Sequence, residues 1–101
     1  MSVVNIDGSA LRSLDDLHDQ IAAHPDTPDF YGRNLDALGD VLTGFFQPPL
    51  DIRVCHAEAA RLSMGADFEK MMSVLQDACR ETEGSTLSVS AGPPPSVGED
   101  R

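Results

Sequence analysis

The sequence has few of the residues that mark a nucleic-acid-binding, membrane-bound or secreted protein. It contains no tryptophan, one tyrosine and only 7 lysine and arginine residues against 17 aspartate and glutamate residues, so its formal net charge is −10. Such a chain lacks the basic surface needed to bind nucleic acid or anionic membranes. A basic protein is its natural electrostatic complement.

Long apolar runs and cysteine frameworks are also missing. No segment has the length of a secretory signal or a membrane span, so we expect a cytoplasmic protein. Cys55 and Cys79 are the two cysteines and show neither metal nor redox spacing, so we expect reduced thiols. Cys55 and His56 are adjacent, which does not match the ligand spacing of a zinc site. The sequence therefore predicts no metal and no cofactor.

Apolar periodicity and turn residues predict strands that alternate with helices. We expect strands at 3–6, 50–54 and 86–90, and helices from Ser13, from Asn34 to Gly44, at 57–61 and at 66–83. Strands separated by helices indicate a parallel sheet with right-handed crossovers. The predicted fold is a small α/β domain over residues 1–90, with three parallel strands packed against helices. Residues 91–101 are rich in proline and glycine and predict a disordered tail.

The stretch FYGRNLDALGDVLTGF, residues 30–45, contains the clearest helix signal. Asn34 is a favourable N-cap residue, because its side-chain oxygen accepts a free amide of the first turn. Gly44 stands where a left-handed residue would end the helix. The face expected to contact the core consists of Leu35, Leu38 and Leu42.

The opposite face of this helix carries two features that disfavour helix formation. Asp36 and Asp40 are like charges one turn apart, and Gly39 lies between them; Thr43 shares the face. Two such aspartates often form only a solvated surface. The residues before the helix favour a binding surface instead, because Phe30 and Tyr31 adjoin Gly32, which permits a tight loop with positive φ. His18 and His24 are expected at the outer side or the end of the first helix.

This stretch resembles the barstar family, small intracellular inhibitors of secreted microbial guanyl-specific ribonucleases. The segments VVNIDGSALRSLDDLHDQIA, PPLDIRV and FEKMMSVLQDACRETEG followed by STLSVS resemble the other strands and helices of that family. The resemblance covers about residues 3–90 and implies the barstar fold. It also implies a basic extracellular ribonuclease as partner, in a 1:1 complex, and no enzymatic activity.

The resemblance further implies which residues contact the ribonuclease. The residue at Asp40 would occupy a phosphate position among basic groups, Asp36 would contact the same basic mouth, and Phe30 would stack at the active site. Glu81 or Arg80 would hold an outlying contact position. The implied partner-binding set is Phe30, Tyr31, Gly32, Asn34, Leu35, Asp36, Gly39, Asp40, Thr43, Gly44, Phe45 and Glu81. Phe30 lacks the aromatic hydroxyl of the best-known member, and Gly39 replaces a large aromatic side chain.

Two other classes of function stay open from the residues themselves. An acidic immunity or decoy protein for another basic nuclease or nucleic-acid-binding protein would have a similar charge. A metal-dependent enzyme could use Asp36 and Asp40, although no histidine or third carboxylate accompanies them on that helix.

Overall fold

The sheet is built from three short strands, and in the first two every second side chain is buried. In the computed structural model, which describes residues 1–94, these strands are β1 (Ser2–Asp7), β2 (Leu50–Cys55) and β3 (Thr86–Val89). β2 lies in the middle and pairs in parallel with both neighbours. The α/β fold with a three-stranded parallel sheet, predicted from the alternation of elements, is confirmed.

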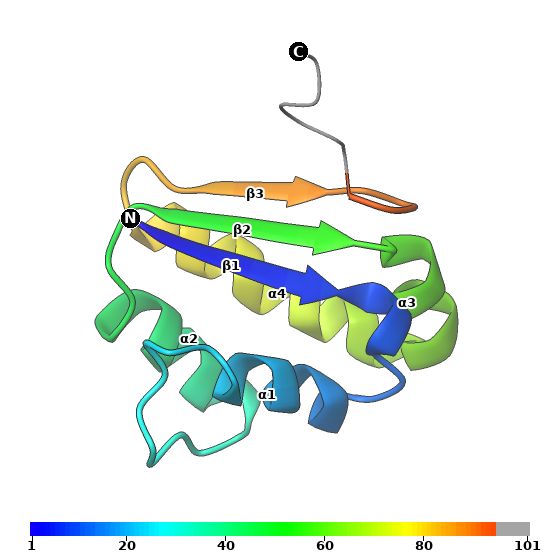
Figure 1. Ribbon diagram of the computed structural model, residues 1–101, viewed down its shortest axis with the longest axis horizontal. Helices are drawn as coiled ribbons and strands as arrows, with labels where there is room; N and C mark the ends of the chain where they lie inside the picture. The colour runs from blue at the N-terminus through cyan, green and yellow to red at the C-terminus, as the bar shows by residue number, and fades with distance from the viewer. Residues whose placement is uncertain (95–101) are drawn as a thin grey trace.

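The helices cover one face of the sheet. Figure 1 shows α1 (Leu14–Ala22), α2 (Leu35–Gly44) and α4 (Ala66–Glu81) on the same side of the strands. α3 (Ala57–Met64) lies at the carboxyl ends of β1 and β2, next to the 3-10 turn η1 (Gly8–Ala10). The core between these layers includes Ile6, Leu11, Leu17, Ile21, Leu38, Leu42, Leu50, Ile52, Met71 and Leu75. Within residues 1–94, no helix is long and apolar enough to cross a membrane.

Several predicted boundaries need correction. α3 extends to Met64 rather than 61, and α4 ends at Glu81 rather than 83. Gly44 is the last residue of α2 and does not adopt the left-handed conformation, because the helix ends at Phe45 with φ −115°. The helix therefore closes without the glycine-specific turn that the sequence suggested.

Ala91 and Gly92, which were predicted to belong to a disordered tail, form hydrogen bonds with the start of α3. The amides of His56, Ala57 and Glu58 donate to the carbonyl oxygens of Gly92, Ser90 and Ala91, at 2.7, 3.0 and 3.3 Å. These bonds satisfy backbone donors at the start of α3, which has no side-chain cap. The residues that follow β3, as far as Gly92, are thus part of the domain. The rest of the prediction, for 95–101, lies outside the described residues.

Candidate functional site: an acidic groove and an exposed aromatic pair

The loop at 24–34, which leads into α2, is held to the domain by contacts within the chain. Tyr31 is only 9% exposed, and its hydroxyl lies 2.6 Å from Nδ1 of His18, which is 2% exposed. Burial raises the pKa of Tyr31 to about 12 and lowers the pKa of His18. The expectation that His18 lies on the outer side of α1 is therefore wrong, and the side chain of Tyr31, which was predicted to contact the partner, is buried. The buried ring of Tyr31 therefore fixes the loop to the domain.

Further anchors hold both ends of this loop. The Nε2 atom of His24 lies 3.1 Å from the carbonyl oxygen of Val3, and its ring stacks on Phe46 with centroids 4.4 Å apart. Arg33 donates to Oδ1 of Asp19 at 2.7 Å, across to α1. These contacts fix the path of the chain into α2 at several independent points.

The left-handed residue of the loop is Arg33, not the neighbouring glycine. Arg33 has φ +57°, whereas Gly32 is not among the positive-φ residues. The glycine serves another purpose, since a Cβ atom there would lie 3.3 Å from the Cβ of Ala37. Gly32 therefore permits close packing of the loop on the first turn of α2.

α2 begins as the sequence predicted. The side-chain oxygen of Asn34 accepts a hydrogen bond from the amide of Ala37 at 2.8 Å. Leu38 and Leu42 are fully buried, and Leu35 packs partly buried at the edge of the core. With this face fixed inward, the opposite face must point outward.

The outward face of α2 and one face of α4 enclose a groove of about 230 Å³. Four carboxylate residues lie along it, and we call it the acidic groove. They are Asp36 and Asp40 of α2 and Asp77 and Glu81 of α4. The remaining lining residues are Leu35, Gly39, Thr43, Val74 and Ala78. The groove therefore gathers the predicted face of α2 with residues more than 30 positions away in the chain.

Glu81 lines this groove, whereas Arg80 lies on a different surface with Gln76 and Leu87. Of the two candidates that the sequence left open, only Glu81 thus adjoins the α2 aspartates. Asp77 was missed. Its signal was present, because residues four apart share a helix face and Asp77 precedes Glu81 by four. Gly39 forms part of the floor, and a Cβ atom there would make an ordinary contact of 3.9 Å with Val74.

Three of the groove carboxylates lack a basic partner among the described residues. Each lysine and arginine within 1–94 forms an ion pair with an acidic side chain, and Arg80 takes Asp77 in this way. None of these pairs includes Asp36, Asp40 or Glu81. Their negative charge is therefore directed to solvent without compensation from this part of the chain.

An aromatic pair completes the surface. Phe30 is 75% exposed and Phe45 is 49% exposed, and their rings meet edge to face with centroids 5.6 Å apart. Thr43 and Gly44, both exposed, connect the groove to Phe45 along the chain. Large apolar side chains in such exposed positions favour a contact surface for a partner.

The positions of the potential metal ligands test the alternative that Asp36 and Asp40 belong to a metal-dependent enzyme. Among residues 1–94, a single group of three potential metal ligands lies close together, and it consists of Asp7, Cys55 and His56. Asp36 and Asp40 are not part of it. Within residues 1–94, Asp36 and Asp40 thus form no group of three ligand atoms within 4.8 Å of one another, with Asp77, Glu81 or any other residue.

Two comparisons with known proteins agree with this arrangement. A sequence model of the family described as "Barstar (barnase inhibitor)" matches residues 1–91. A protein of Bacillus subtilis (strain 168) named "Putative ribonuclease inhibitor YrdF" is 37% identical over 81 residues, which cover 80% of this chain and 89% of that protein. The family match spans the loop, both helices of the acidic groove and all three strands. The chain belongs to the barstar family.

Proposed function

We propose that this protein inhibits a basic, extracellular, guanyl-specific microbial ribonuclease by inserting α2 and the loop before it into the active site. The observation that carries the proposal is the set of unpaired carboxylates in the acidic groove. Asp36, Asp40 and Glu81 have no basic partner among the described residues. A ribonuclease must present positive charge where it binds RNA phosphate, and it supplies the missing partners.

The α2 aspartates act as phosphate mimics in this proposal. Asp40 is exposed near the middle of α2, on a helix whose other face is buried, so its carboxylate is presented from a fixed backbone. Charge-assisted hydrogen bonds from arginine to a carboxylate are among the strongest in proteins. Asp36, Asp77 and Glu81 extend the acidic surface around it. The inhibitor thus offers rigidly spaced negative charges without a cleavable bond.

The aromatic pair and the floor of the groove provide the shape of the contact. Phe30 and Phe45 supply apolar area at the rim of the proposed interface. Gly39 leaves room above Val74 for a side chain of the ribonuclease. Asn34 and Gly32 contribute by fixing the loop rather than by charge. We further propose a 1:1 complex, a cytoplasmic inhibitor and no enzymatic activity of its own.

A cleavage assay tests this function. Guanyl-specific RNA cleavage by a basic microbial ribonuclease is measured with and without the full-length protein, and the expected result is stoichiometric loss of cleavage. Asp40→Ala is expected to restore cleavage. Asp67→Ala is the matched control, because it removes the same charge from α4 outside the groove. Full cleavage in the presence of the wild-type protein, for every guanyl-specific ribonuclease tried, would contradict the proposal.

A second measurement separates this function from that of a general acidic decoy. Binding is compared for the ribonuclease and for unrelated basic nucleic-acid-binding proteins at physiological salt. An inhibitor with a shaped interface binds the ribonuclease and loses that binding on Phe30→Ala and Asp40→Ala. Equal binding to all basic proteins, unaffected by Phe30→Ala, would indicate a decoy instead.

A further inference from the structure

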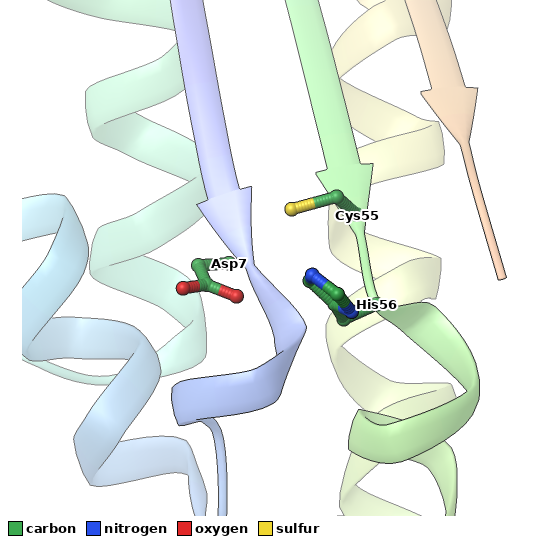
Figure 2. Close-up of side chains that lie close together, drawn as sticks. All are labelled: Asp7, Cys55 and His56. Carbon is green, nitrogen blue, oxygen red and sulfur yellow. The ribbon is translucent and has the colours of Figure 1, made fainter. Parts of the chain in front are cut away.

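We propose that Asp7, Cys55 and His56 form a binding site for a divalent transition-metal ion of the zinc type. Their ligand atoms, a carboxylate oxygen, a thiol sulfur and an imidazole nitrogen, all lie within 4.8 Å of one another. Figure 2 shows the three side chains gathered at the ends of β1 and β2. None of them lines the acidic groove, so this site is independent of the proposed inhibition.

The parallel pairing of β1 and β2 brings these residues together. Asp7 and Cys55 are register partners at the carboxyl ends of their strands. His56 follows Cys55 directly, and its side chain would point to the other face if the strand continued. Instead, His56 adopts a left-handed conformation with φ 50° and ψ 40°. The expected absence of a metal rested on the spacing of cysteines and of Cys55 and His56 along the chain, whereas Asp7 comes from a strand distant in sequence.

The backbone around the three ligands is closely fixed. A Cβ atom on Gly8 would lie 2.3 Å from the carbonyl oxygen of His56 and 2.6 Å from that of Cys55, so only glycine permits this approach. The side-chain amide of Gln20 bonds both the amide and the carbonyl of Asp7, at 2.8 and 3.0 Å. The amide of His56 donates to Gly92 at 2.7 Å. The ligands are therefore held near one another before any ion binds.

Each side chain keeps an atom available for a metal. One oxygen of Asp7 accepts hydrogen bonds from the amide and hydroxyl of Ser9, at 3.0 and 2.6 Å, which lower the pKa of the carboxyl group. The other oxygen of Asp7 has no hydrogen bond within the described chain. Cys55 makes only a long contact of 3.6 Å from its sulfur to the carbonyl oxygen of Ile6. The imidazole of His56 has no hydrogen-bond partner among the described residues.

The donor set selects the class of metal. Oxygen, sulfur and nitrogen together suit Zn²⁺ or Co²⁺, whereas Mg²⁺ and Ca²⁺ require oxygen ligands. A carboxylate and a thiolate also balance the two positive charges. Tetrahedral zinc, with bonds of ~2.0–2.3 Å, places its ligand atoms about 3.5 Å apart. The ligand atoms of the present cluster lie within 4.8 Å of one another, close to that spacing. The three side chains supply three ligands and leave the fourth tetrahedral position for water.

Cobalt titration tests the site in the reduced, full-length protein freed of any affinity tag. The expected result is one equivalent of Co²⁺ bound, with thiolate-to-cobalt absorption in the near ultraviolet and visible bands typical of tetrahedral cobalt. One equivalent of Zn²⁺ is expected to displace it. Cys55→Ser should abolish the thiolate absorption. Cys79→Ser is the matched control, because Cys79 is the other free thiol and belongs to no group of three potential ligands within residues 1–94.

Three further variants test the other ligands and the residue that positions Asp7. Asp7→Asn retains an acceptor for Ser9 but loses the charge, and it should weaken Zn²⁺ binding, as should His56→Gln. Ser9→Ala removes the hydroxyl bond to Asp7 but keeps the bond from the Ser9 backbone amide, and it should weaken binding by about 10–100-fold. Far-ultraviolet circular dichroism verifies that each variant is folded. Equal loss of the cobalt bands in Cys55→Ser and Cys79→Ser, or their absence in the wild type, would overturn the proposal.

Discussion

The loop at 24–34 and the acidic groove adjoin one another but differ in whether their polar side chains have partners within the chain. In the loop, Tyr31, His24 and Arg33 each find a partner within the chain. In the groove, Asp36, Asp40 and Glu81 find none among the described residues. Internal hydrogen bonds and ion pairs thus fix the loop, whereas the acidic groove keeps exposed carboxylates that repel one another. In the proposed function, a basic partner relieves this repulsion.

Among the changes in the acidic groove and the loop, Asp40→Ala in the groove should have the largest effect, and the effect is on binding. Binding to the ribonuclease is expected to weaken by about 2–5 kcal/mol, mainly through faster dissociation, because arginines of the partner lose their counter-charge. The free protein should be as stable or slightly more stable, since repulsion from Asp36 is removed. Surface plasmon resonance and chemical denaturation measure the two quantities. Unfolding of the variant, or an unchanged complex, would contradict the assignment.

Tyr31→Phe should show the reverse pattern, with the fold affected more than the interface. The change removes the hydroxyl next to Nδ1 of His18 and leaves a buried polar atom without its partner. A loss of about 1–3 kcal/mol in the free energy of unfolding is expected. Binding should weaken only as far as the loop loosens. Phe30→Ala is the control, because its exposed ring has no such role; a variant as stable as the wild type would show that the loop is held otherwise.

Acidification should weaken the loop anchor through His18. Burial lowers the pKa of His18 in the folded protein below its ordinary value of 6.5, so the unfolded chain binds the proton more readily. The stabilisation is fully present above pH 6.5 and is lost as the pH falls from there through the folded pKa. Denaturation at a series of pH values measures this slope, with His18→Gln as the variant. An equal slope in that variant would assign the effect to other groups.

Two truncated proteins test whether the hydrogen bonds from the start of α3 to residues 91 and 92 stabilise the fold. Removal of residues after Ser90 deletes the acceptors for His56 and Glu58 and should cost about 0.5–1.5 kcal/mol for each hydrogen bond. Truncation after Pro94 retains these acceptors and is expected to leave the melting temperature and inhibition unchanged. Differential scanning calorimetry compares the two. Equal melting temperatures would mean that these bonds contribute nothing to stability.

Gly39→Ala should give the smallest change in stability, and it tests whether a partner contacts the floor of the acidic groove. The added methyl group meets only Val74 at ordinary contact distance, and alanine favours a helix over glycine. The free protein should gain about 0.4–1 kcal/mol in stability. The same methyl group narrows the groove, so binding should weaken if a partner side chain enters there. A more stable variant with unchanged affinity would show that the floor of the groove is not contacted.

The parts of the molecule that depend on local sequence could be predicted. Asn34 caps α2 because a cap needs only the next three residues, and the leucine spacing determined which face of that helix is buried. The parallel sheet followed from the alternation of elements. The groove face of α2 was predictable for the same reason, since Asp36 and Asp40 share one helix.

The parts that depend on tertiary placement could not be predicted. Tyr31 and His18 are 13 residues apart, and no local rule pairs them. The left-handed residue is Arg33 because tertiary contacts outweigh the intrinsic preference of Gly32. The meeting of Asp7 with Cys55 depends on strand register, which no short motif encodes. Prediction failed where the partner came from another element.

The bonds at the start of α3 also set an order for folding during synthesis. Its first three amide donors belong to residues 56–58, and their acceptors belong to residues 90–92. A ribosome makes these acceptors more than 30 residues after the donor residues. The amino-terminal turn of α3 therefore completes its hydrogen bonding only once β3 has left the exit tunnel. The start of α3 thus reaches its native hydrogen bonding together with residues 90–92 and not earlier in synthesis.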